Sequence, residues 1–564
     1  MRRAAIILLA VVALTATATA QPSIPLAGPS DAFRGDALER TAADDRRNFQ
    51  QIGAKLRTGR DTALAWRQLD SMLAAPTGDM FWTYPATAFY FYCNDLLTPA
   101  WKAKFRHVWK TWTPYRGDTE NHFLMYYATL YLMAGEWPDL PGSEWFNGKS
   151  SAENLREAEE YLAHWMDETL RYGLTEWDSP RYFYFYMLPL LTLYDHARDD
   201  GIAGGSEKVI LHLLADYAAE YLAGCYAGAH SRDGDGSVID PRNAEARSYA
   251  EFYWEDSLAM ALPDLAFAAM SRFRCPLVIA EIAHDRDRPF LHREVKRSRA
   301  KMRYDTARFT RVEKTTYMTR DYALGSITGG LQQPIQQHSW DVTFAAARPN
   351  NTLFALHPYA SGRELGMFFP EEPELMAESI LSSKASYGSE NKWVGGSPYE
   401  SITQWGGSLT ARYDIPPGTR FGHVDFFLPK SLDMLIKDSD GWIICVMGDV
   451  VVGIRVDAAD SIAWSEEEKN RRLRLYGGTV GYTVTTGGRD LMMSGPVGAA
   501  LAGRVRADSI RWGGRTSFDS IIYDGPHLQQ RSGSDTLTLR SPQRTMILKG
   551  EREKGREGKG EDGE

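Results

Sequence analysis

Apolar residues recur at helical spacing along the first half of the chain. From about Ala42 to Ser271 they follow one another at this spacing, with short Gly- and Pro-bearing turns between the repeats. The pattern predicts helices over Thr62–Ala75, Thr87–Leu97, Pro99–Thr111, Glu120–Gly135, Ser151–Tyr172, Ser179–Asp199, Ser206–Ala227 and Ala244–Met270. Many of these helices are apolar on more than one face, which indicates packing in two layers. A ring of helical hairpins, an (α/α) toroid, would satisfy the pattern, and so would a solenoid.

Past Pro289 the pattern changes to short runs of β-branched and aromatic residues separated by turn residues. The runs predict strands over Thr315–Tyr317, Ala323–Ile327, Val342–Ala345, Thr352–Leu356, Leu409–Tyr413, His423–Leu428, Trp442–Met447, Val450–Val456 and Thr479–Thr486. Their number and spacing predict an antiparallel β-sandwich or a related all-β layer domain. We therefore expect a multidomain chain, with a helical domain over 21–290 and a β-domain over 291–550.

Two segments of the second half carry no such pattern. Lys384–Gln404 is expected to be a long loop, because turn residues such as Gly395 and Pro398 interrupt it. Residues 551–564 are charged and of low complexity, so this tail is expected to be disordered.

The first twenty residues have the three-part pattern of a secretory signal peptide. Arg2 and Arg3 precede an apolar run from Ala4 to Leu14, and small residues end at Ala20, before Gln21. This run is too short for a convincing membrane span, and the remainder has no apolar run of roughly 18 residues. We expect an exported protein, secreted or periplasmic, that is free of the membrane after cleavage of residues 1–20.

Aromatic residues make up 12% of the chain and are dense in its first half, as in Phe81–Tyr84, Phe89–Tyr92 and Tyr182–Tyr186. Many must belong to the core, because aromatic side chains bury large areas. Clusters of this kind are also typical of clefts in which sugar rings stack. The formal net charge of -9 argues against a general nucleic-acid binder.

Cysteine and acidic spacing give no metal motif. Cys93, Cys225, Cys275 and Cys445 are scattered without paired spacing, which indicates neither a zinc site nor a disulfide-dense scaffold. One or two bridges and buried free thiols are both open. The stretch Asp233–Asp240 has only a faint likeness to a calcium loop, so a plain turn is expected there. No metal and no other cofactor is predicted.

An amide and an imidazole stand side by side at one predicted helix start. Asp118 or Thr119 would cap this helix, and Glu120, Asn121 and His122 would fill its first turn. A first turn has unpaired N–H groups and the positive end of the helix dipole, so it attracts anions. These side chains could face a ligand carboxylate; a capping turn with a structural histidine is the alternative.

Tyr182 stands near a second predicted helix start. Ser179 and Pro180 mark this start, because proline is tolerated at the first helical position. Glu176 and Asp178 precede it, so carboxylates and a phenol lie within one short segment. Taken alone, the phenol could be a buried one with a paired hydroxyl, and the glutamate a capping residue.

A third polar segment and a pair of arginines complete the candidate chemistry. Gln336–Asp341 lies between predicted strands and contains His338 and Trp340. Arg232 and Arg247 stand in turn-like or helix-start contexts, and an arginine fork suits a carboxylate or sulfate. Ordinary surface ion pairs explain each arginine equally well when it is taken alone.

Together these features resemble the heparinase II/III-like polysaccharide lyases and their alginate-lyase relatives. The resemblance lies in an aromatic-rich helical domain before a β-sandwich, the Asn121-His122 pair, Tyr182 at a later helix start and His338 early in the sandwich. It covers nearly the whole mature chain, although its motifs are short. It implies an (α/α) toroid-like domain followed by a β-sandwich. It also implies an anionic, uronate-containing polysaccharide or oligosaccharide as the partner, cleaved by β-elimination.

The resemblance also implies roles for single residues. β-Elimination removes the proton at C5 of a uronate and expels the C4 oxygen, so the carboxylate must be neutralised and an acid and a base supplied. Asn121, assisted by His122, would neutralise the carboxylate. Tyr182 would be the acid, and also the base where both proton transfers occur on one face. His338 would be the base for the opposite stereochemistry or would assist Tyr182. The expected substrate contacts are Glu120, Glu176, Arg232, Arg247, Tyr249 and Trp340.

The chain departs from the lyase pattern, and alternatives remain open. No second tyrosine or metal-ligand cluster is identified in the predicted sandwich, so the sugar is not carried over from heparin or alginate. An inverting glycoside hydrolase on a similar helical toroid would use two carboxylates from Glu120, Glu176 and Asp178, roughly 6.5–9.5 Å apart. A non-catalytic glycan-binding protein would have aromatic platforms without a convergent acid and base.

Overall fold

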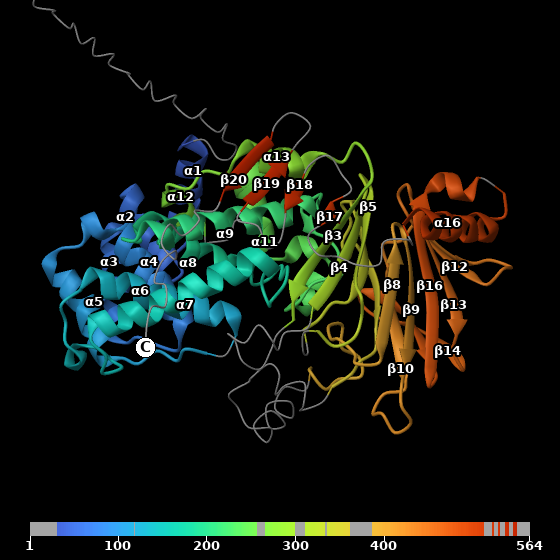
Figure 1. Cartoon of the computed structure of the whole chain (residues 1–564), viewed down its shortest axis with the longest axis horizontal. Helices are drawn as coiled ribbons and strands as arrows, with labels where there is room; N and C mark the ends of the chain where they lie inside the picture. Colours follow the sequence, from blue (N-terminus) through green and yellow to red (C-terminus); the bar gives the residue numbers. More distant parts are fainter. Residues whose placement is uncertain are drawn as a thin grey trace, which may run out of the picture.

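The computed structural model describes residues 31–117, 119–255, 265–298, 311–332, 336–360, 386–493, 495–512, 522–523, 528–530, 536–540 and 545–549. The expected signal peptide (1–20) and charged tail (551–564) lie outside these ranges. Figure 1 shows helices at one end of the molecule and β-sheets at the other. Among the described helices, none is both long enough and apolar enough to cross a lipid bilayer.

Helices make up the N-terminal region. They are α1 (Asp31–Ala42), α2 (Phe49–Thr58), α3 (Thr62–Ala74), α4 (Met80–Tyr92), α5 (Pro99–Thr111), α6 (Glu120–Glu136), α7 (Ser151–Tyr172), α8 (Phe183–His196), α9 (Asp200–Ala219), α10 (Asp235–Ile239), α11 (Ala246–Ala250), α12 (Ala266–Met270) and α13 (Leu277–His284). The predicted ranges of α5 and α7 are those observed, and α3 and α6 differ by one residue at the C-terminal end. Ser150 and Glu153 form a capping box that begins α7.

Two predicted helices have the wrong ends. The range Thr87–Leu97 begins too late, because α4 starts at Met80 and continues through Pro85. Its buried aromatic packing outweighs the hydrogen bond that an interior proline removes. The range Ser206–Ala227 ends too late, because the chain leaves α9 and forms the hairpin of β1 (Tyr221–Leu222) and β2 (Cys225–Tyr226). The hairpin turn has positive φ at both central residues, which a helix cannot accommodate.

Two other predicted helices are interrupted. The range Ser179–Asp199 contains a turn before α8 begins at Phe183. The range Ala244–Met270 is divided into α11, a π-helical turn at Glu251–Glu255 and α12, and residues 256–264 lie outside the described ranges. The helices α1, α2, α10, α13 and α16 (Val497–Trp512) were not predicted, and α10 stands where a plain turn was expected.

The strands form antiparallel sheets. A nine-stranded sheet has the order β14-β15-β10-β7-β6-β5-β4-β3-β17. Its strands are β3 (Phe290–Arg297), β4 (Arg311–Met318), β5 (Tyr322–Ile327), β6 (Trp340–Phe344), β7 (Thr352–Leu356), β10 (His423–Pro429), β14 (Ser461–Glu466), β15 (Asn470–Tyr476) and β17 (Ile522–Tyr523). A six-stranded sheet has the order β11-β12-β13-β16-β9-β8. Its strands are β8 (Glu400–Trp405), β9 (Ser408–Asp414), β11 (Met434–Lys437), β12 (Trp442–Met447), β13 (Val450–Ala458) and β16 (Thr479–Gly488).

These sheets confirm the predicted change from helices to antiparallel strands. β7 and β12 have the predicted bounds, whereas β3, β8, β11, β14, β15 and β17 were not predicted. The expected loop Lys384–Gln404 is wrong at its end, because β8 starts at Glu400 and its inward residues alternate with exposed ones. The helix α16 (Val497–Trp512) and a small sheet of β18 (Leu528–Gln530), β19 (Thr536–Arg540) and β20 (Thr545–Lys549) complete the described chain.

The two large sheets share one apolar core, to which Trp340 of the larger sheet and Tyr482 of the smaller sheet both belong. The other face of the nine-stranded sheet packs against the helical region, for example where Val312 and Ile327 meet Trp177. The helix α16 covers the outer face of the six-stranded sheet (Figure 1). The four cysteines are buried as free thiols.

Charged side chains are buried where the helical region meets β3 and β4. We call this group the junction network, and it consists of Asp178, Asp216, Glu220, Glu294, Lys296 and Lys314. Lys296 Nζ lies 2.6 Å from Asp216 and 3.1 Å from Asp178. Lys314 Nζ lies 2.7 Å from Asp178 and also contacts Glu220. The network therefore ties the end of α9 and the segment after α7 to two neighbouring strands.

The carboxyl groups of the junction network have opposite pKa shifts. Burial by itself raises the pKa of Asp178, but Lys296 and Lys314 outweigh it and hold that pKa well below the ordinary value. Burial and the nearby Asp178 raise the pKa of Glu294 well above its ordinary value. The raised pKa favours the neutral form of Glu294, in which the carboxyl group adds no negative charge to the network.

Removing one ammonium from the junction network should destabilise the protein strongly. Lys314→Met takes an ammonium partner from the buried carboxylates of Asp178 and Glu220, which costs about 3–5 kcal/mol. We expect this loss in the free energy of unfolding measured by urea denaturation at pH 7. Lys430→Met, at a lysine that is far more exposed, is the control and should change stability by about 0.5 kcal/mol or less. Equal effects of the two variants would contradict the role of the network.

Low pH should reduce the free energy of unfolding, because Glu220 becomes protonated. Burial alone raises the pKa of Glu220, but Lys314 and His292 lower it to about 2. This pKa lies below the value of about 4.3 in the unfolded chain, so the stabilisation is complete above about pH 4.3 and is lost as the pH falls towards 2. Urea denaturation at a series of pH values should show a smaller slope in this window for Glu220→Gln than for the wild type. Identical slopes would show that Glu220 does not contribute.

Candidate functional site

The first turn of α6 is tied to the segment that follows α7. Glu120 accepts hydrogen bonds from Trp165 Nε1 (3.0 Å), Thr175 Oγ1 (2.8 Å) and the backbone N–H of Glu176 (2.9 Å). Arg297 of β3 lies 3.3 Å from the same carboxylate. Both carboxylate oxygens are occupied in this way. Glu120 was expected to contact a substrate. Its carboxylate is instead used fully in contacts within the protein.

Glu176 occupies the anion position at this helix start. Asn121 Nδ2 donates to Glu176 Oε2 at 2.6 Å, and the backbone N–H of Asn121 lies 3.4 Å from the same oxygen. The hydroxyl of Tyr186 also donates to it at 2.6 Å. Asn121 and Glu176 are fully buried.

The expectation that the side chain of Asn121 faces a ligand carboxylate is therefore wrong. Unpaired N–H groups and a helix dipole attract any nearby anion, and here the anion is a carboxylate of the protein itself. Burial, and secondly the charges of Glu176 and Glu120, raise the pKa of Tyr186 well above its ordinary value, so its hydroxyl remains a donor. Glu176 is consequently held by its neighbours and does not point towards a ligand.

The second oxygen of Glu176 holds Arg232. Arg232 Nε lies 3.1 Å from Glu176 Oε1, and the side chain of Arg232 is buried. Its guanidinium carbon lies 4.3 Å from the ring centroid of Tyr182, within the range of a cation–π interaction. The ring of Tyr182 is partly exposed. A buried chain of contacts from Asn121 through Glu176 and Arg232 thus reaches the surface at Tyr182.

Two strained residues set this geometry. Asp178 has φ 47° and Arg232 has φ 51°, which is the left-handed region that residues other than glycine rarely adopt. Ser179 links their segments, because its hydroxyl donates to the backbone oxygen of Arg232 (3.1 Å) and accepts the N–H of Tyr182 (3.0 Å). Such strain costs about 1–3 kcal/mol per residue and gathers at functional sites. The two positions favour a functional site at this place.

Partly exposed aromatic rings extend from Tyr182 along the starts of α4, α6 and α8. We call them the aromatic row, and it consists of Tyr182, Phe185, Phe81 and His122. Successive centroids are 5.5 Å (Tyr182 to Phe185), 4.9 Å (Phe185 to Phe81) and 5.1 Å (Phe81 to His122) apart. Gly117 packs against the end of the row, since a Cβ there would lie 2.2 Å from His122 Nδ1. The row joins His122 to Tyr182 on one surface.

His338 is buried. Its backbone pairs with that of His230 in both directions, at 2.8 and 3.0 Å, and its Nε2 lies 3.2 Å from Asp341 Oδ2. The backbone N–H of Asp233 donates to Gln336 at 3.0 Å, which brings the segment next to Arg232 against the segment before β6. Burial raises the pKa of Asp233 to about 6, although His338 opposes the shift. The structure thus brings His338 to the edge of the site, with only 3% of its surface exposed.

Three expected substrate contacts lie elsewhere. Trp340 is fully buried between the sheets and donates to the hydroxyl of Tyr482 at 2.8 Å. Tyr249 is fully buried in the core of the helical region. Arg247 Nε lies 2.8 Å from Glu251, one turn further along the helix. For these residues the expected contact with substrate is corrected to a structural role, because burial or an existing ion pair takes up each side chain.

Sequence reasoning missed Phe81 and Phe185 as site residues. The signal was present in the aromatic clusters, but nothing along the chain separates their partly exposed rings from the buried Tyr84 and Tyr186. Whether a ring on α4 or α8 is exposed depends on which helices pack against it, and the neighbouring residues in the sequence do not specify this.

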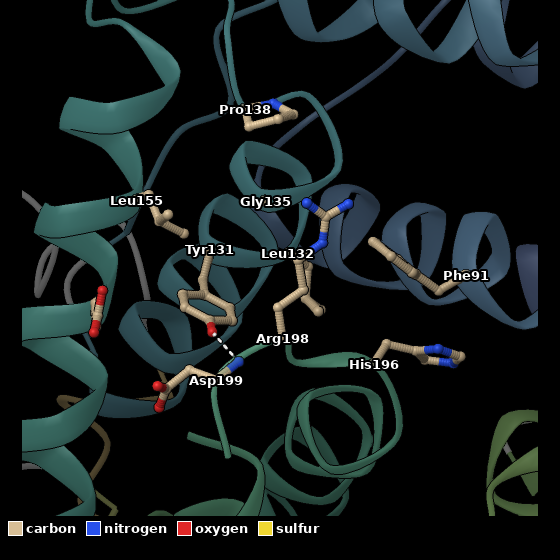
Figure 2. Close-up of a pocket in the computed structure, with 10 residues that line it drawn as sticks. Phe91, Tyr131, Leu132, Gly135, Pro138, Leu155, His196, Arg198 and Asp199 are labelled. Carbon is tan, nitrogen blue, oxygen red and sulfur yellow. Dashed lines mark hydrogen bonds between the residues drawn. The ribbon is translucent and has the colours of Figure 1, made fainter. Parts of the chain in front are cut away.

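A cavity of about 300 Å³ lies at the other end of α6 and α8. Figure 2 shows Tyr131, His196 and Arg198 around it, with Phe91 at one side. None of the residues expected at the site lines this cavity. It is therefore separate from the aromatic row.

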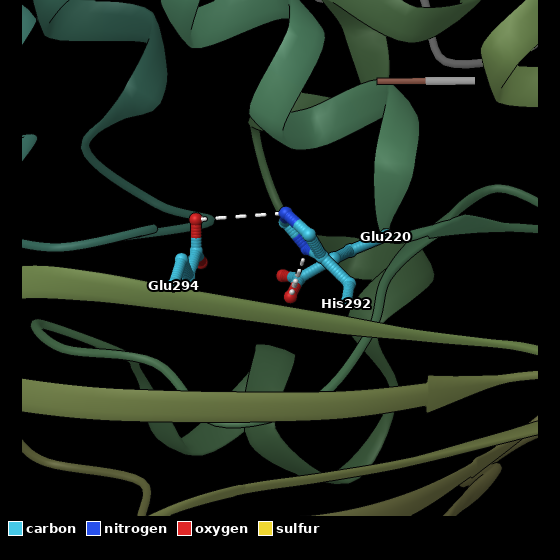
Figure 3. Close-up of side chains that lie close together, drawn as sticks. All are labelled: Glu220, His292 and Glu294. Carbon is cyan, nitrogen blue, oxygen red and sulfur yellow. Dashed lines mark hydrogen bonds and ion pairs between the residues drawn. The ribbon is translucent and has the colours of Figure 1, made fainter. Parts of the chain in front are cut away.

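Glu220, His292 and Glu294 bring possible metal ligands together (Figure 3). His292 Nδ1 lies 3.1 Å from Glu220, and its Nε2 lies 3.8 Å from Glu294. The two carboxylates thus lie at opposite nitrogens of the imidazole ring. A single metal ion would bind only one of these nitrogens. Lys296 and Lys314 already bring positive charge to these carboxylates. We therefore assign the group to the junction network.

Substitutions at Asn121 should show that it is a donor to Glu176. Asn121→Ala removes a buried hydrogen bond and should lower the free energy of unfolding by about 1–3 kcal/mol. Asn121→Asp places a second carboxylate against Glu176 and should cost more at pH 7. The excess should shrink at pH 5, because adjacent carboxylates then share a proton. Urea denaturation at both pH values measures this, and an Asp variant no worse than the Ala variant would contradict the contact.

Comparison of the chain with protein-family models and with curated proteins gives no match. The interpretation of this site therefore depends on its own geometry and chemistry. Its surface member is Tyr182, and its buried members are Asn121, Glu176 and Arg232.

Proposed function

We propose that this chain is an exported polysaccharide lyase that cleaves a uronate-containing polysaccharide or oligosaccharide by β-elimination. The observation that carries the proposal is the position of Tyr182, which is partly exposed and lies against the buried guanidinium of Arg232. The aromatic row beside it provides apolar surface of the kind that stacks against sugar rings. A side chain that can transfer protons thus adjoins a cation and a stacking surface.

Tyr182 transfers both protons in this proposal. Its phenolate oxygen takes the proton from C5, and the resulting hydroxyl gives a proton to the C4 oxygen as the C4–O bond breaks. Arg232 stabilises negative charge on the phenolic oxygen, and Glu176 and Asn121 hold Arg232 in place. His338 is buried against Asp341 and supports the site from behind, so both proton transfers occur on one face of the sugar.

The proposal extends to the fold and the location. The helical region is an (α/α) toroid-like domain, and the facing sheets are a β-sandwich. Contacts of α6 with both α4 and α8, and of α7 with α9, support two concentric layers of helices. The core shared by the two sheets supports the sandwich. The protein acts in the periplasm or outside the cell, after removal of residues 1–20.

The geometry disfavours an inverting glycoside hydrolase. Glu120 Oε2 and Glu176 Oε2 accept from the same hydroxyl of Tyr186, at 3.3 and 2.6 Å. They are therefore closer together than the roughly 6.5–9.5 Å that inverting hydrolysis needs. Asp178 is held by Lys296 and Lys314 inside the junction network. A glycan-binding protein without activity shares the aromatic row and is an outcome of the experiment below.

A panel of uronate polysaccharides tests the activity. The wild type should form products that absorb in the unsaturated-uronate band, because β-elimination leaves a C4–C5 double bond beside the carboxylate. Tyr182→Phe should lower kcat by about 10²- to 10⁴-fold, since the phenolic oxygen performs the proton transfer. Tyr476→Phe, at an exposed tyrosine of β15, is the matched control and should behave as the wild type.

Other results would replace the proposal. New reducing ends without new absorbance would identify a hydrolase. Binding of the polysaccharides without any cleavage would identify a glycan-binding protein. Equal activity of Tyr182→Phe and the wild type would remove Tyr182 from the reaction.

A further inference from the structure

A uronate substrate needs a cation that the buried residues cannot supply. Asn121 donates its amide to Glu176, and Arg232 forms an ion pair with the same carboxylate. Each is buried, so neither offers a free donor to a carboxylate that arrives from solvent. If Tyr182 removes the C5 proton, the neighbouring carboxylate must still be neutralised. The required positive group must be exposed and close to Tyr182.

Arg181 meets both conditions. Its side chain is 48% exposed, and its guanidinium carbon lies 5.8 Å from the ring centroid of Tyr182. Its nearest carboxylate is that of Glu245, with the closest N–O distance 4.0 Å, which is beyond hydrogen-bond length. The guanidinium donates no hydrogen bond to any residue that the structure describes. Its planar fork is thus open to a carboxylate, for which it has matching geometry.

The surroundings of Arg181 leave room for such a ligand. Gly234 faces its guanidinium, and a Cβ at that position would lie 3.7 Å from Nη1. Burial raises the pKa of Glu245 and of Asp235, while the charge of Arg181 opposes both shifts. Neither carboxylate is within hydrogen-bond distance of Arg181. A ligand carboxylate can therefore compete for it.

The aromatic row continues from this point. Phe185 lies next to Tyr182, and Phe81 lies next to Phe185. The C–H face of a pyranose packs on such rings, while its carboxylate projects from the ring edge. A sugar stacked beside Tyr182 could therefore present its carboxylate to Arg181.

We propose that Arg181 and the aromatic row form the subsite that binds the uronate residue undergoing elimination, with Arg181 as the group that pairs with its carboxylate. This inference rests on the proposed lyase function and changes one part of it. The carboxylate is neutralised by an exposed arginine beside Tyr182, and Asn121 positions Arg232. The substrate class is then a polymer with free carboxylates, and methyl-esterified residues lose this contact.

Binding measured without turnover tests the subsite directly. In the Tyr182→Phe background, tetrasaccharides from polygalacturonate, alginate and hyaluronan are titrated by calorimetry, each as the free acid and as the methyl ester. Arg181→Gln should weaken binding of the free acid that binds best by about tenfold or more, because a charge-assisted hydrogen bond is lost. The same substitution should leave binding of the methyl ester nearly unchanged. Arg181→Lys should retain part of the affinity, since it keeps the charge without the fork.

Arg412→Gln is the control, at an exposed arginine of β9 on the six-stranded sheet, and it should bind every ligand as the parent does. Steady-state kinetics on the wild-type background should show a higher KM for Arg181→Gln with a smaller change in kcat. An equal loss of affinity for acid and ester, or no loss beyond that of Arg412→Gln, would overturn the subsite. If Arg181→Gln weakens binding of the free acid but the wild type forms no unsaturated product, the lyase function is overturned and the subsite is kept.

Discussion

The desolvation of charge between the helices and the nine-stranded sheet is the constraint on which the rest of the structure depends. Burying an ion without partners of opposite charge or hydrogen-bond donors costs several kcal/mol of folding stability. The segment after α7 brings two carboxylates to this place. Glu176 turns towards Asn121 and Arg232, whereas Asp178 turns towards Lys296 and Lys314.

The two carboxylates lie on either side of the fully buried Trp177. The backbone oxygen of Trp177 accepts hydrogen bonds from the N–H and the hydroxyl of Ser231, at 3.0 and 2.8 Å. Two ion clusters are thereby attached to one short segment, and this segment leads directly to Tyr182. The helix start that carries Tyr182 is therefore held in place by both ion clusters.

This support changes the meaning of the Asn-His pair at the start of α6. Asn121 acts inside the protein, on a carboxylate that in turn fixes an arginine. His122, its neighbour in the chain, belongs to the aromatic row at the surface. The first turn of α6 thus contributes the buried Asn121 and the partly exposed His122, because consecutive residues of a helix point in different directions. Tyr182, Arg181 and His122 are the polar members of the site that are not fully buried.

The sequence by itself determined the order of helices and antiparallel strands, because hydrophobic periodicity and turn residues act over a few neighbouring positions. It also identified the helix start at Glu120. Only the tertiary structure decided that Glu176 takes the anion position of Asn121, that Trp340 and Tyr249 are core, and that Phe81 and Phe185 adjoin Tyr182. These outcomes depend on burial and on partners far away in the chain, and a local pattern of residues specifies neither.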